Sequence, residues 1–514
     1  MTPPYDVVIV GGGHNGLTAA AYLGKAGKRV LVLEKLDNVG GAAVSAQSFD
    51  GVDARLSRYS YLVSLLPARI IRDLGLTIEL KRRRYSSYTP QPGTDRGVLI
   101  DAGDPVATAR ALGADADAWA AFYDGTARLA RALFPTVTEP LLTRSEARRA
   151  LGDDALWDSL IERPIGASIE ETFSDDLVRG VVLTDALIGT FVPNVDPTLA
   201  GNRCFLYHVI GNETGNWDVP VGGMGAVSTE LLDAARRAGA EIVTGAEVLA
   251  IDPDGEVTYR LGDAEVRVAG DFVLANVAPY VLEKLVSLPA SESKPEGAQV
   301  KVNLLLKRLP KLKDASVDPA AAFGGTFHIN ELWSQLDAAY DVAAGGGIPN
   351  PLPCEIYCHS LTDPSILSPE LRASGAQTLT VFGLHAPDRL VTEATNDVVR
   401  AELQASVLAS LDSVLAEPIE PLLLTDAADR PAIETKTTLD LEHALAMPGG
   451  NIFHGPLSWP FVEDDAPLTT AAERWGVATK HPRILLCGSG AQRGGAVSGI
   501  GGHNAAMAVL ELLA

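Results

Sequence analysis

A chain of 514 residues with 46% apolar and 21% charged residues has the composition of a folded globular protein and the length of two or three domains. Its formal net charge is −23, from 42 basic and 65 acidic residues, which argues against a nucleic-acid partner because phosphate binding needs clustered positive charge. The short basic run Lys81 to Arg84 fits a solvated loop or strand end, and the overall acidity disfavours electrostatic docking on anionic lipid.

Cysteine usage and hydropathy restrict the class further. The four cysteines are too few and too scattered for a disulfide framework. Cys354 and Cys358 have only His359 beside them, which does not complete a zinc ligand set, so we expect no metal. The N-terminal apolar run lacks a preceding basic segment, and no stretch of about 18 apolar residues spans a membrane. We expect a cytoplasmic protein, with peripheral membrane contact left open.

The chain opens on the order strand, glycine turn, helix, strand. Residues 5–10 (Tyr-Asp-Val-Val-Ile-Val) form the β-branched run typical of a strand buried on both faces. Residues 17–25, rich in alanine and leucine, are predicted to be helical, and residues 29–33 to form a second apolar strand. The turn carries the pattern G-x-G-x-x-G at Gly11, Gly13 and Gly16, with His14 and Asn15 inside it.

This pattern predicts a dinucleotide site. Gly11 permits a tight turn, Gly13 lets backbone N–H groups approach a pyrophosphate, and Gly16 lets the helix pack close to the strand. The helix N-terminus offers free N–H donors to the phosphates. Glu34 closes the second strand, 18 residues after Gly16. Its carboxylate can accept hydrogen bonds from ribose hydroxyls and would repel a 2′-phosphate, which disfavours NADP.

Two more glycine-rich segments point to FAD. Gly40 and Gly41, within the stretch Lys35 to Ala42, resemble the second FAD motif of the amine oxidase and phytoene desaturase superfamily, where the backbone again approaches phosphate. Near the C-terminus we predict a strand at residues 483–487 and a helix at 504–513. The glycine loop 488–499 between them is placed to meet the ribityl chain and the flavin.

Three segments together resemble the phytoene desaturase-like FAD-dependent oxidoreductases. They are residues 8–23 with Gly-His-Asn-Gly, residues 222–228 (Gly-Gly-Met-Gly-Ala-Val-Ser) and the C-terminal glycine loop. This group includes carotenoid desaturases, carotenoid isomerases and retinol saturases, and the likeness is closest to a mostly uncharacterised desaturase-like branch. Residues 493–497 depart from the usual Pro-Gly-Gly-Gly-Val, because Arg493 stands first and Ala496 fourth. If the loop keeps its place, Arg493 would put a cation near the flavin.

The resemblance implies an α/β fold with a discontinuous, Rossmann-like FAD-binding domain of the amine oxidase/phytoene desaturase type and an α+β substrate domain. The FAD-binding domain would take residues 1–85, 215–290 and 440–514, and the substrate domain 86–214 and 291–439. Patterning within these blocks predicts helices and strands. The helices are expected at 117–133 and 224–238, and the strands at 241–251, 272–276, 299–306 and 378–384.

Site residues follow from the motifs and the resemblance. The expected FAD contacts are Gly11, Gly13, His14, Asn15, Gly16, Glu34, Lys35, Gly40, Gly41, Ala42, Val248, Gly488, Gly495 and Val497. The candidates for the flavin face are Arg58, Tyr59, Trp217, Met224 and Arg493. Tyr207 and His208 are candidates for the substrate cavity, although a role as packed, hydrogen-bonded core side chains is the simpler interpretation. No general base is assigned, and His454 before Gly455 has a structural use in a turn.

The predicted function is FAD-dependent dehydrogenation of an apolar small molecule, with isoprenoids and polyenes as candidates and hydride passing to flavin N5. No second dinucleotide fingerprint follows a strand, so we expect oxygen, a quinone or a carrier protein as the electron acceptor. Three alternatives stay open. They are a redox-neutral isomerase that uses reduced FAD, an amine oxidase with an aromatic cage drawn from Tyr59, Tyr61 and Trp217, and a flavin-containing binding protein without turnover.

Overall fold

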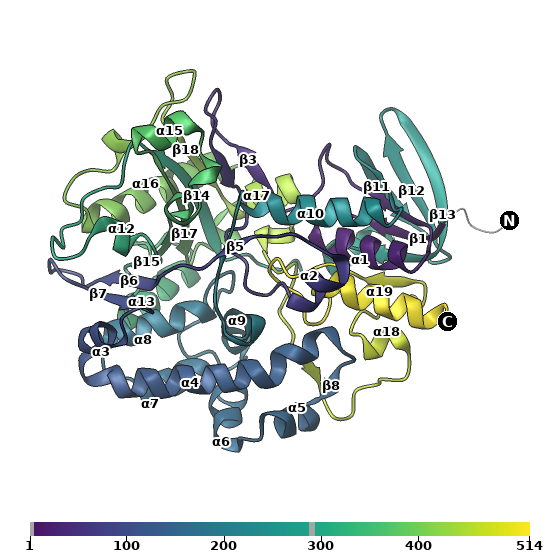
Figure 1. Cartoon of the computed structure of the whole chain (residues 1–514), viewed down its shortest axis with the longest axis horizontal. Coiled ribbons are helices and arrows are strands. Elements are labelled where there is room, and N and C mark those ends of the chain that lie inside the picture. Colours follow the sequence, from purple (N-terminus) through teal and green to yellow (C-terminus); the bar gives the residue numbers. More distant parts are fainter. Residues whose placement is uncertain (1–4, 287–292) are drawn as a thin grey trace.

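The chain folds around two large sheets, and the computed structural model describes residues 5–286 and 293–514 (Figure 1). The first sheet runs β10-β2-β1-β13-β12-β11, and β20 adds to it by pairing with β13. The strands β10, β2, β1, β13 and β20 are parallel, whereas β11, β12 and β13 form an antiparallel meander. In chain order the strands are β1 (Tyr5–Val10), β2 (Val30–Leu33), β10 (Glu241–Val243), β11 (Ala246–Ile251), β12 (Glu256–Leu261), β13 (Ala264–Ala275) and β20 (Ile484–Leu486).

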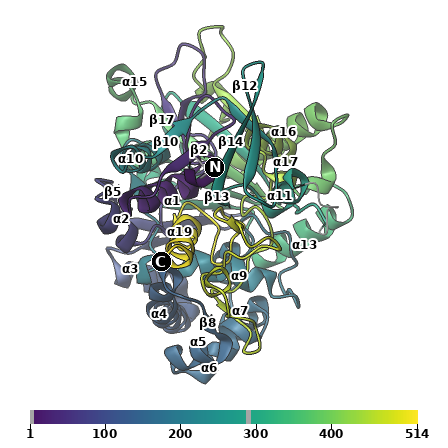
Figure 2. The same ribbon diagram turned by 90° about the vertical axis from the view of Figure 1, so that its right-hand side faces the viewer.

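Both faces of the parallel strands are covered, which is why β1 and β2 are apolar without alternation (Figure 2). Val7 and Ile9 of β1 pack into a core with three helices, whereas Val8 and Val10 face the meander and a fourth helix. The three helices are α1 (His14–Lys25), α10 (Met224–Arg237) and α19 (Ile500–Leu512), and the fourth is α11 (Pro279–Leu285).

The second sheet has the order β18-β14-β17-β16-β15-β6-β7, and only β15 and β6 pair in parallel. Alternate residues of β14 divide its two faces. Val300, Val302 and Leu304 pack beneath helix α16 (Asn396–Val414), whereas the polar Lys301 and its neighbours face the other way. The strands are β6 (Tyr85–Pro90), β7 (Gly97–Asp101), β14 (Gln299–Leu306), β15 (Thr326–Ile329), β16 (Cys354–Tyr357), β17 (Gln377–Leu384) and β18 (Ile433–Lys436).

A helical layer lies below the second sheet in Figure 1 and buries the largest apolar cluster of the described residues, which includes the buried Trp157 and Phe205. Its main helices are α3 (Pro105–Leu112), α4 (Ala116–Leu133), α5 (Arg144–Leu151), α6 (Asp154–Trp157), α7 (Ile165–Thr172), α8 (Asp176–Leu183) and α9 (Ala200–Val209). Helix α13 (Trp333–Ala344) packs against α8, and helix α17 (Thr438–Leu445) follows β18 in the chain. No helix in residues 5–286 and 293–514 is long and apolar enough to cross a membrane.

The predicted helices and strands are present, with corrected bounds. The strand expected at 272–276 is the end of the longer β13, and the stretch 241–251 divides into β10 and β11. Two helix starts also differ. The first helix begins at His14 and the last at Ile500, each several turn residues earlier than expected. Glycines masked both starts, because glycine disfavours helix interiors. Tertiary contact explains their presence: a Cβ on Gly502 would lie 2.0 Å from Asn15 O, so the N-termini of α1 and α19 approach each other too closely for a side chain.

Candidate functional site

A cavity of about 430 Å³ lies at the carboxyl ends of the parallel strands of the first sheet and extends to the second sheet. Val10, Leu33 and Asn276, which end or follow β1, β2 and β13, line one part of it. Gln299 and Phe382 of the second sheet line the other part. The carboxyl edge of a parallel sheet is where α/β proteins bind ligands, because the loops and helix N-termini gather there.

One end of the cavity is polar and is organised by Glu34. Its Oε2 accepts from Gly12 N at 2.7 Å, and its Oε1 accepts from Leu36 N at 2.9 Å. Burial raises the pKa of Glu34, although these backbone N–H groups favour the ionised form. Each carboxylate oxygen keeps a lone pair for another donor. Val248 of β11 lines the cavity beside it.

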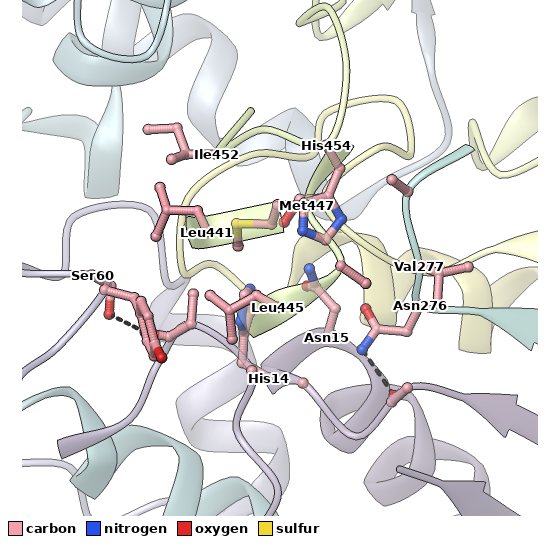
Figure 3. Close-up of a pocket in the computed structure, with 18 of the residues that line it drawn as sticks. His14, Asn15, Ser60, Asn276, Val277, Leu441, Leu445, Met447, Ile452 and His454 are labelled. Atoms are coloured by element: carbon pink, nitrogen blue, oxygen red, sulfur yellow. Dashed lines mark hydrogen bonds between the residues drawn. The ribbon is translucent and has the colours of Figure 1, made fainter. Parts of the chain in front are cut away.

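The N-terminus of α1 faces the middle of the cavity, and no side chain caps it. Its first N–H groups are therefore available to a ligand. His14 Nε2 and Asn15 Oδ1 are buried polar atoms without a partner among the described residues. Gly41 approaches the same turn so closely that a Cβ on it would lie 3.4 Å from Gly13 Cα. Figure 3 shows His14 and Asn15 beside Asn276, whose Nδ2 donates to Gly11 O at 2.9 Å.

The C-terminal glycine loop closes one side of the cavity with Ser489, Gly495, Ala496 and Val497. Gly495 has φ +104° and Ala496 +52°, so the loop turns sharply with its backbone towards the cavity wall. Arg493 does not line the cavity, contrary to the expectation of a cation near the flavin. It is 1% exposed, and its guanidinium donates to Thr136 O, Glu139 O and Trp475 O. These carbonyls turn the side chain towards the helical layer.

The far end of the cavity is apolar and aromatic. The rings of Tyr61 and Trp217 stack with centroids 5.7 Å apart and planes within 5°. Trp217 also stacks on His208, whose Nδ1 lies 2.8 Å from Cys204 O, and its indole N–H donates to His208 O. The Tyr207 hydroxyl donates to Ser458 O at 2.9 Å. Leu62, Leu65 and Ile188 also line the cavity. Leu441, Leu445, Met447 and Ile452 form a further apolar wall, which Figure 3 shows near His14 and His454.

The structure brings most of the predicted FAD contacts to this one cavity. Gly16, Gly40 and Gly488 do not line it, and each is instead closely packed against neighbouring atoms. A Cβ on Gly16 would lie 2.2 Å from Gly11 O. The contacts that do line the cavity are Gly11, Gly13, His14, Asn15, Glu34, Lys35, Gly41, Ala42, Val248, Gly495 and Val497.

Only some of the candidates for the flavin face and the substrate cavity line this cavity. Tyr59, Trp217, Tyr207 and His208 line the cavity. Arg58 and Met224 do not. The Arg58 guanidinium pairs with Glu434, with Nε 3.0 Å from Oε1. Met224 is fully buried at the start of α10, and its N–H donates to Ser57 Oγ.

Sequence reasoning missed the wall formed by α17 and the segment after it, because Leu441 and Met447 look like ordinary core residues. It also missed Lys301, a lysine within an apolar strand, which was a usable signal. Lys301 is 1% exposed, its Nζ donates to Ser57 O and Ser60 O, and burial holds its pKa well below the usual range. Ser60 lines the cavity, so Lys301 fixes the strand segment behind its wall.

Comparisons with known proteins agree with this architecture. Residues 9–69 match the family model described as an NAD(P)-binding Rossmann-like domain. The fold is similar to that of cyclohexylamine oxidase from Brevibacterium oxydans, at 18% identity and a TM-score of 0.58 over 99% of this chain and 100% of that one. The chain is thus a mixed α/β protein with a Rossmann-like domain and the fold of the flavin amine oxidase type.

A relative that matches over the whole chain shows the family. The uncharacterized protein Rv0897c of Mycobacterium tuberculosis is 58% identical over 525 residues, covering 99% of this chain and 98% of that protein. The chain belongs to the same family as Rv0897c. The pyridine nucleotide-disulfide oxidoreductase domain-containing protein 2 of Mus musculus is 29% identical over 573 residues, covering 99% of this chain and 94% of that protein.

Proposed function

We propose that the protein is an FAD-dependent oxidoreductase that dehydrogenates an apolar small molecule. The observation that supports this best is that one cavity joins Glu34 and the N-terminus of α1 to an apolar, aromatic chamber. A dinucleotide fills the first part, and a substrate fills the second. The similarity to proteins named as oxidases and oxidoreductases agrees with this assignment.

The donors and acceptors along the cavity fit FAD. Glu34 would accept from the adenosine ribose, and the α1 N-terminus would hold the pyrophosphate. The unpartnered His14 Nε2 and Asn15 Oδ1 supply further polar contacts beside it. The loop from Gly495 to Val497 would contact the flavin ring. Burial lowers the pKa of His14 to about 4, so its ring is neutral at pH 7 and its unprotonated nitrogen can accept a hydrogen bond.

When bound, FAD supplies the hydride acceptor, and the protein orients the substrate against it. Tyr59, Trp217 and Phe382 form walls that exclude water from the chamber. The Tyr207 hydroxyl already donates to Ser458 O, which leaves the ring face for an apolar substrate. Dehydrogenation would pass a hydride from one carbon to the bound flavin and release a proton from the adjacent carbon to solvent, and no residue of this chamber is assigned as a general base.

Amine oxidation is a second candidate, which the Tyr61 and Trp217 pair favours. The stacked rings of Tyr61 and Trp217 bring aromatic surface to the wall of the cavity, where an amine can contact it. The two candidates differ in their product, because amine oxidation releases ammonia or a smaller amine and desaturation does not.

We propose that the chain divides as the motifs suggest, with FAD held by residues 1–85, 215–290 and 440–514 and the substrate by 86–214 and 291–439. Strands of the first sheet come from the first set, and those of the second sheet come almost entirely from the second set.

An anaerobic spectral titration tests the function. The purified protein, reconstituted with FAD, should show oxidised-flavin absorption that bleaches when a substrate of the right class is added from a panel of isoprenoids, polyenes and amines. Conversion only after chemical reduction of the flavin would replace dehydrogenation by isomerisation. Failure to bind FAD would refute the proposal.

A further inference from the structure

A second cavity of about 300 Å³ adjoins the first. Tyr61, Ile188, His208 and Trp217 line both, so these four residues form the boundary between the two spaces. The walls of the second cavity come from α4, β6, β15, β16 and the 3-10 turn at residues 184–186. Its outer rim includes the exposed residues Arg82, Ser86 and Thr214, so it opens at the protein surface.

Two carboxylates in this cavity lack full hydrogen bonding. Asp185 has neither a hydrogen bond nor an ion pair with any residue that the structure describes. Glu355 is 2% exposed, and its Oε2 accepts from the Tyr357 hydroxyl at 2.8 Å. Its Oε1 has no donor within the described parts of the chain. A sequestered carboxylate without donors is costly, so both groups are open to a donor brought by a ligand.

The charge balance of the cavity favours a cation. Behind Glu355 a third carboxylate, Glu331, pairs with His328, with Nδ1 and Oε2 2.7 Å apart. Arg83 also lines the cavity, but it donates to the neutral acceptors Trp217 O and Thr326 Oγ1. Arg82 and Asp218 also line the cavity and pair with each other, with Nε and Oδ1 3.3 Å apart, and His208 lines it together with His328. Apart from the pair Arg82 and Asp218, three carboxylates lie in or behind the cavity wall with one arginine and two histidines. Burial and the neighbouring Glu331 raise the pKa of Glu355 to about 8, and burial raises the pKa of Asp185, so a bound cation would favour the ionised carboxylates and an anion would oppose them.

Aromatic rings line the same space. Trp119 and Tyr123 of α4 lie with ring centroids 4.5 Å apart, and Tyr357 and the stacked pair Tyr61 and Trp217 form other walls. Carboxylates combined with ring faces are the usual surroundings of an organic ammonium group. Within the described residues no group of three or more metal-ligating side chains is placed to hold a metal ion, so an organic cation fits better than a metal.

We propose that the second cavity binds the ammonium group of a substrate whose apolar part extends past the boundary residues Tyr61, Ile188, His208 and Trp217 into the first cavity. Asp185 and Glu355 accept from the ammonium N–H groups, and the neighbouring rings cover its carbon-bound side. This proposal rests on the proposed function for the role of the first cavity. It deepens that function by naming the substrate class, an amine-bearing apolar molecule anchored away from the flavin.

Isothermal titration calorimetry of the full-length protein, with and without added FAD, tests the proposal with three probes of one shape. They are tert-octylamine, the corresponding alcohol 2,4,4-trimethylpentan-2-ol and the carboxylate 2,2,4,4-tetramethylpentanoate. The carbon beside the amine nitrogen bears no hydrogen, so oxidation at that carbon does not confuse the measurement. At pH 7 we expect the amine to bind about tenfold or more tightly than the alcohol, and the carboxylate to bind weakest.

Two isosteric variants and one control locate the effect. Asp185→Asn and Glu355→Gln each remove one charge and should weaken amine binding about tenfold while leaving alcohol binding unchanged. Asp124 lies on helix α4, which carries Trp119 and Tyr123 of the cavity wall, but its side chain is 69% exposed, so Asp124→Asn should bind the amine like the unaltered protein. Equal affinity for amine and carboxylate, or amine binding that neither cavity variant weakens, would overturn the proposal.

FAD binding and amine binding can be tested independently, because neither Asp185 nor Glu355 lines the first cavity. Both variants should therefore bind FAD like the unaltered protein, which also reports that they are folded. FAD binding without charge-dependent amine binding would refute the ammonium site alone. Charge-dependent amine binding without FAD binding would support the site and refute the proposed function.

Discussion

Glu34→Gln tests the assignment of the dinucleotide end directly. Glu34 accepts from two backbone N–H groups, Gly12 N at 2.7 Å and Leu36 N at 2.9 Å. Glutamine has one carbonyl oxygen and one amide group, so one of these N–H groups would lose its acceptor and face a donor. Leaving one buried N–H unpaired costs about 1–3 kcal/mol in the free energy of unfolding.

Glu34→Gln should also weaken FAD binding, by a free energy similar to its effect on stability. A charge-assisted hydrogen bond to a ribose hydroxyl contributes about 1.5–3 kcal/mol, and about 1.4 kcal/mol corresponds to a tenfold change in Kd. We therefore expect the Kd for FAD to rise by about 10- to 100-fold, measured by quenching of flavin fluorescence on titrating apoprotein.

Glu247→Gln is the matched control. Glu247 lines the same cavity, but its side chain is 38% exposed and pairs with Lys35 and Arg260. Exposed ion pairs contribute at most about 1 kcal/mol, so this variant should bind FAD nearly normally. Equal weakening by both substitutions, or an unchanged Kd in Glu34→Gln, would show that the ribose does not bind at Glu34.

Three further substitutions or conditions give distinct outcomes. Gly16→Ala places a methyl group 2.2 Å from Gly11 O, so the turn must move by about 1 Å; FAD binding should be lost and unfolding in urea should occur about 1–3 kcal/mol more easily, and normal FAD affinity would contradict the close packing. Arg493→Lys keeps the charge but cannot reach three carbonyls, so the free energy of unfolding should fall by about 2–4 kcal/mol, whereas unchanged urea stability would mean that these bonds contribute little. Burial lowers the pKa of five histidines to about 3 or 4, so their contribution to the free energy of unfolding is full above about pH 6.5 and is lost as the pH falls towards those values. The loss is about 1.4 kcal/mol per pH unit for each proton taken up on unfolding. A constant free energy of unfolding between pH 7 and 5 would contradict this prediction. The five are His14, His359, His385, His454 and His503.

Several features follow from the sequence because their causes are local. The strand at residues 5–10, the glycine turn and Glu34 all lie within the first 34 residues, and each has a backbone reason to be what it is. The same holds for the strand, loop and helix near the C-terminus. These segments predicted the Rossmann-like domain and most residues that line the first cavity.

Other features depend on partners far away in the sequence. Arg493 lies in a glycine loop, but its direction is decided by the carbonyls of Thr136 and Glu139, more than 350 residues earlier. Helix α19 begins at Ile500 through two glycines because it crosses α1 closely. Neither partner is visible in the local sequence pattern.

By itself the sequence determined where a dinucleotide binds, because phosphate and ribose are contacted by backbone and by one acid at fixed spacing. Only the tertiary structure decided what lies beyond it. Asp185, Glu355 and Trp119 come from a turn, a strand and a helix that have no shared sequence motif, and they meet only when the helical layer packs against the second sheet. Substrate recognition is built from such scattered side chains, so it is set by packing rather than by local pattern.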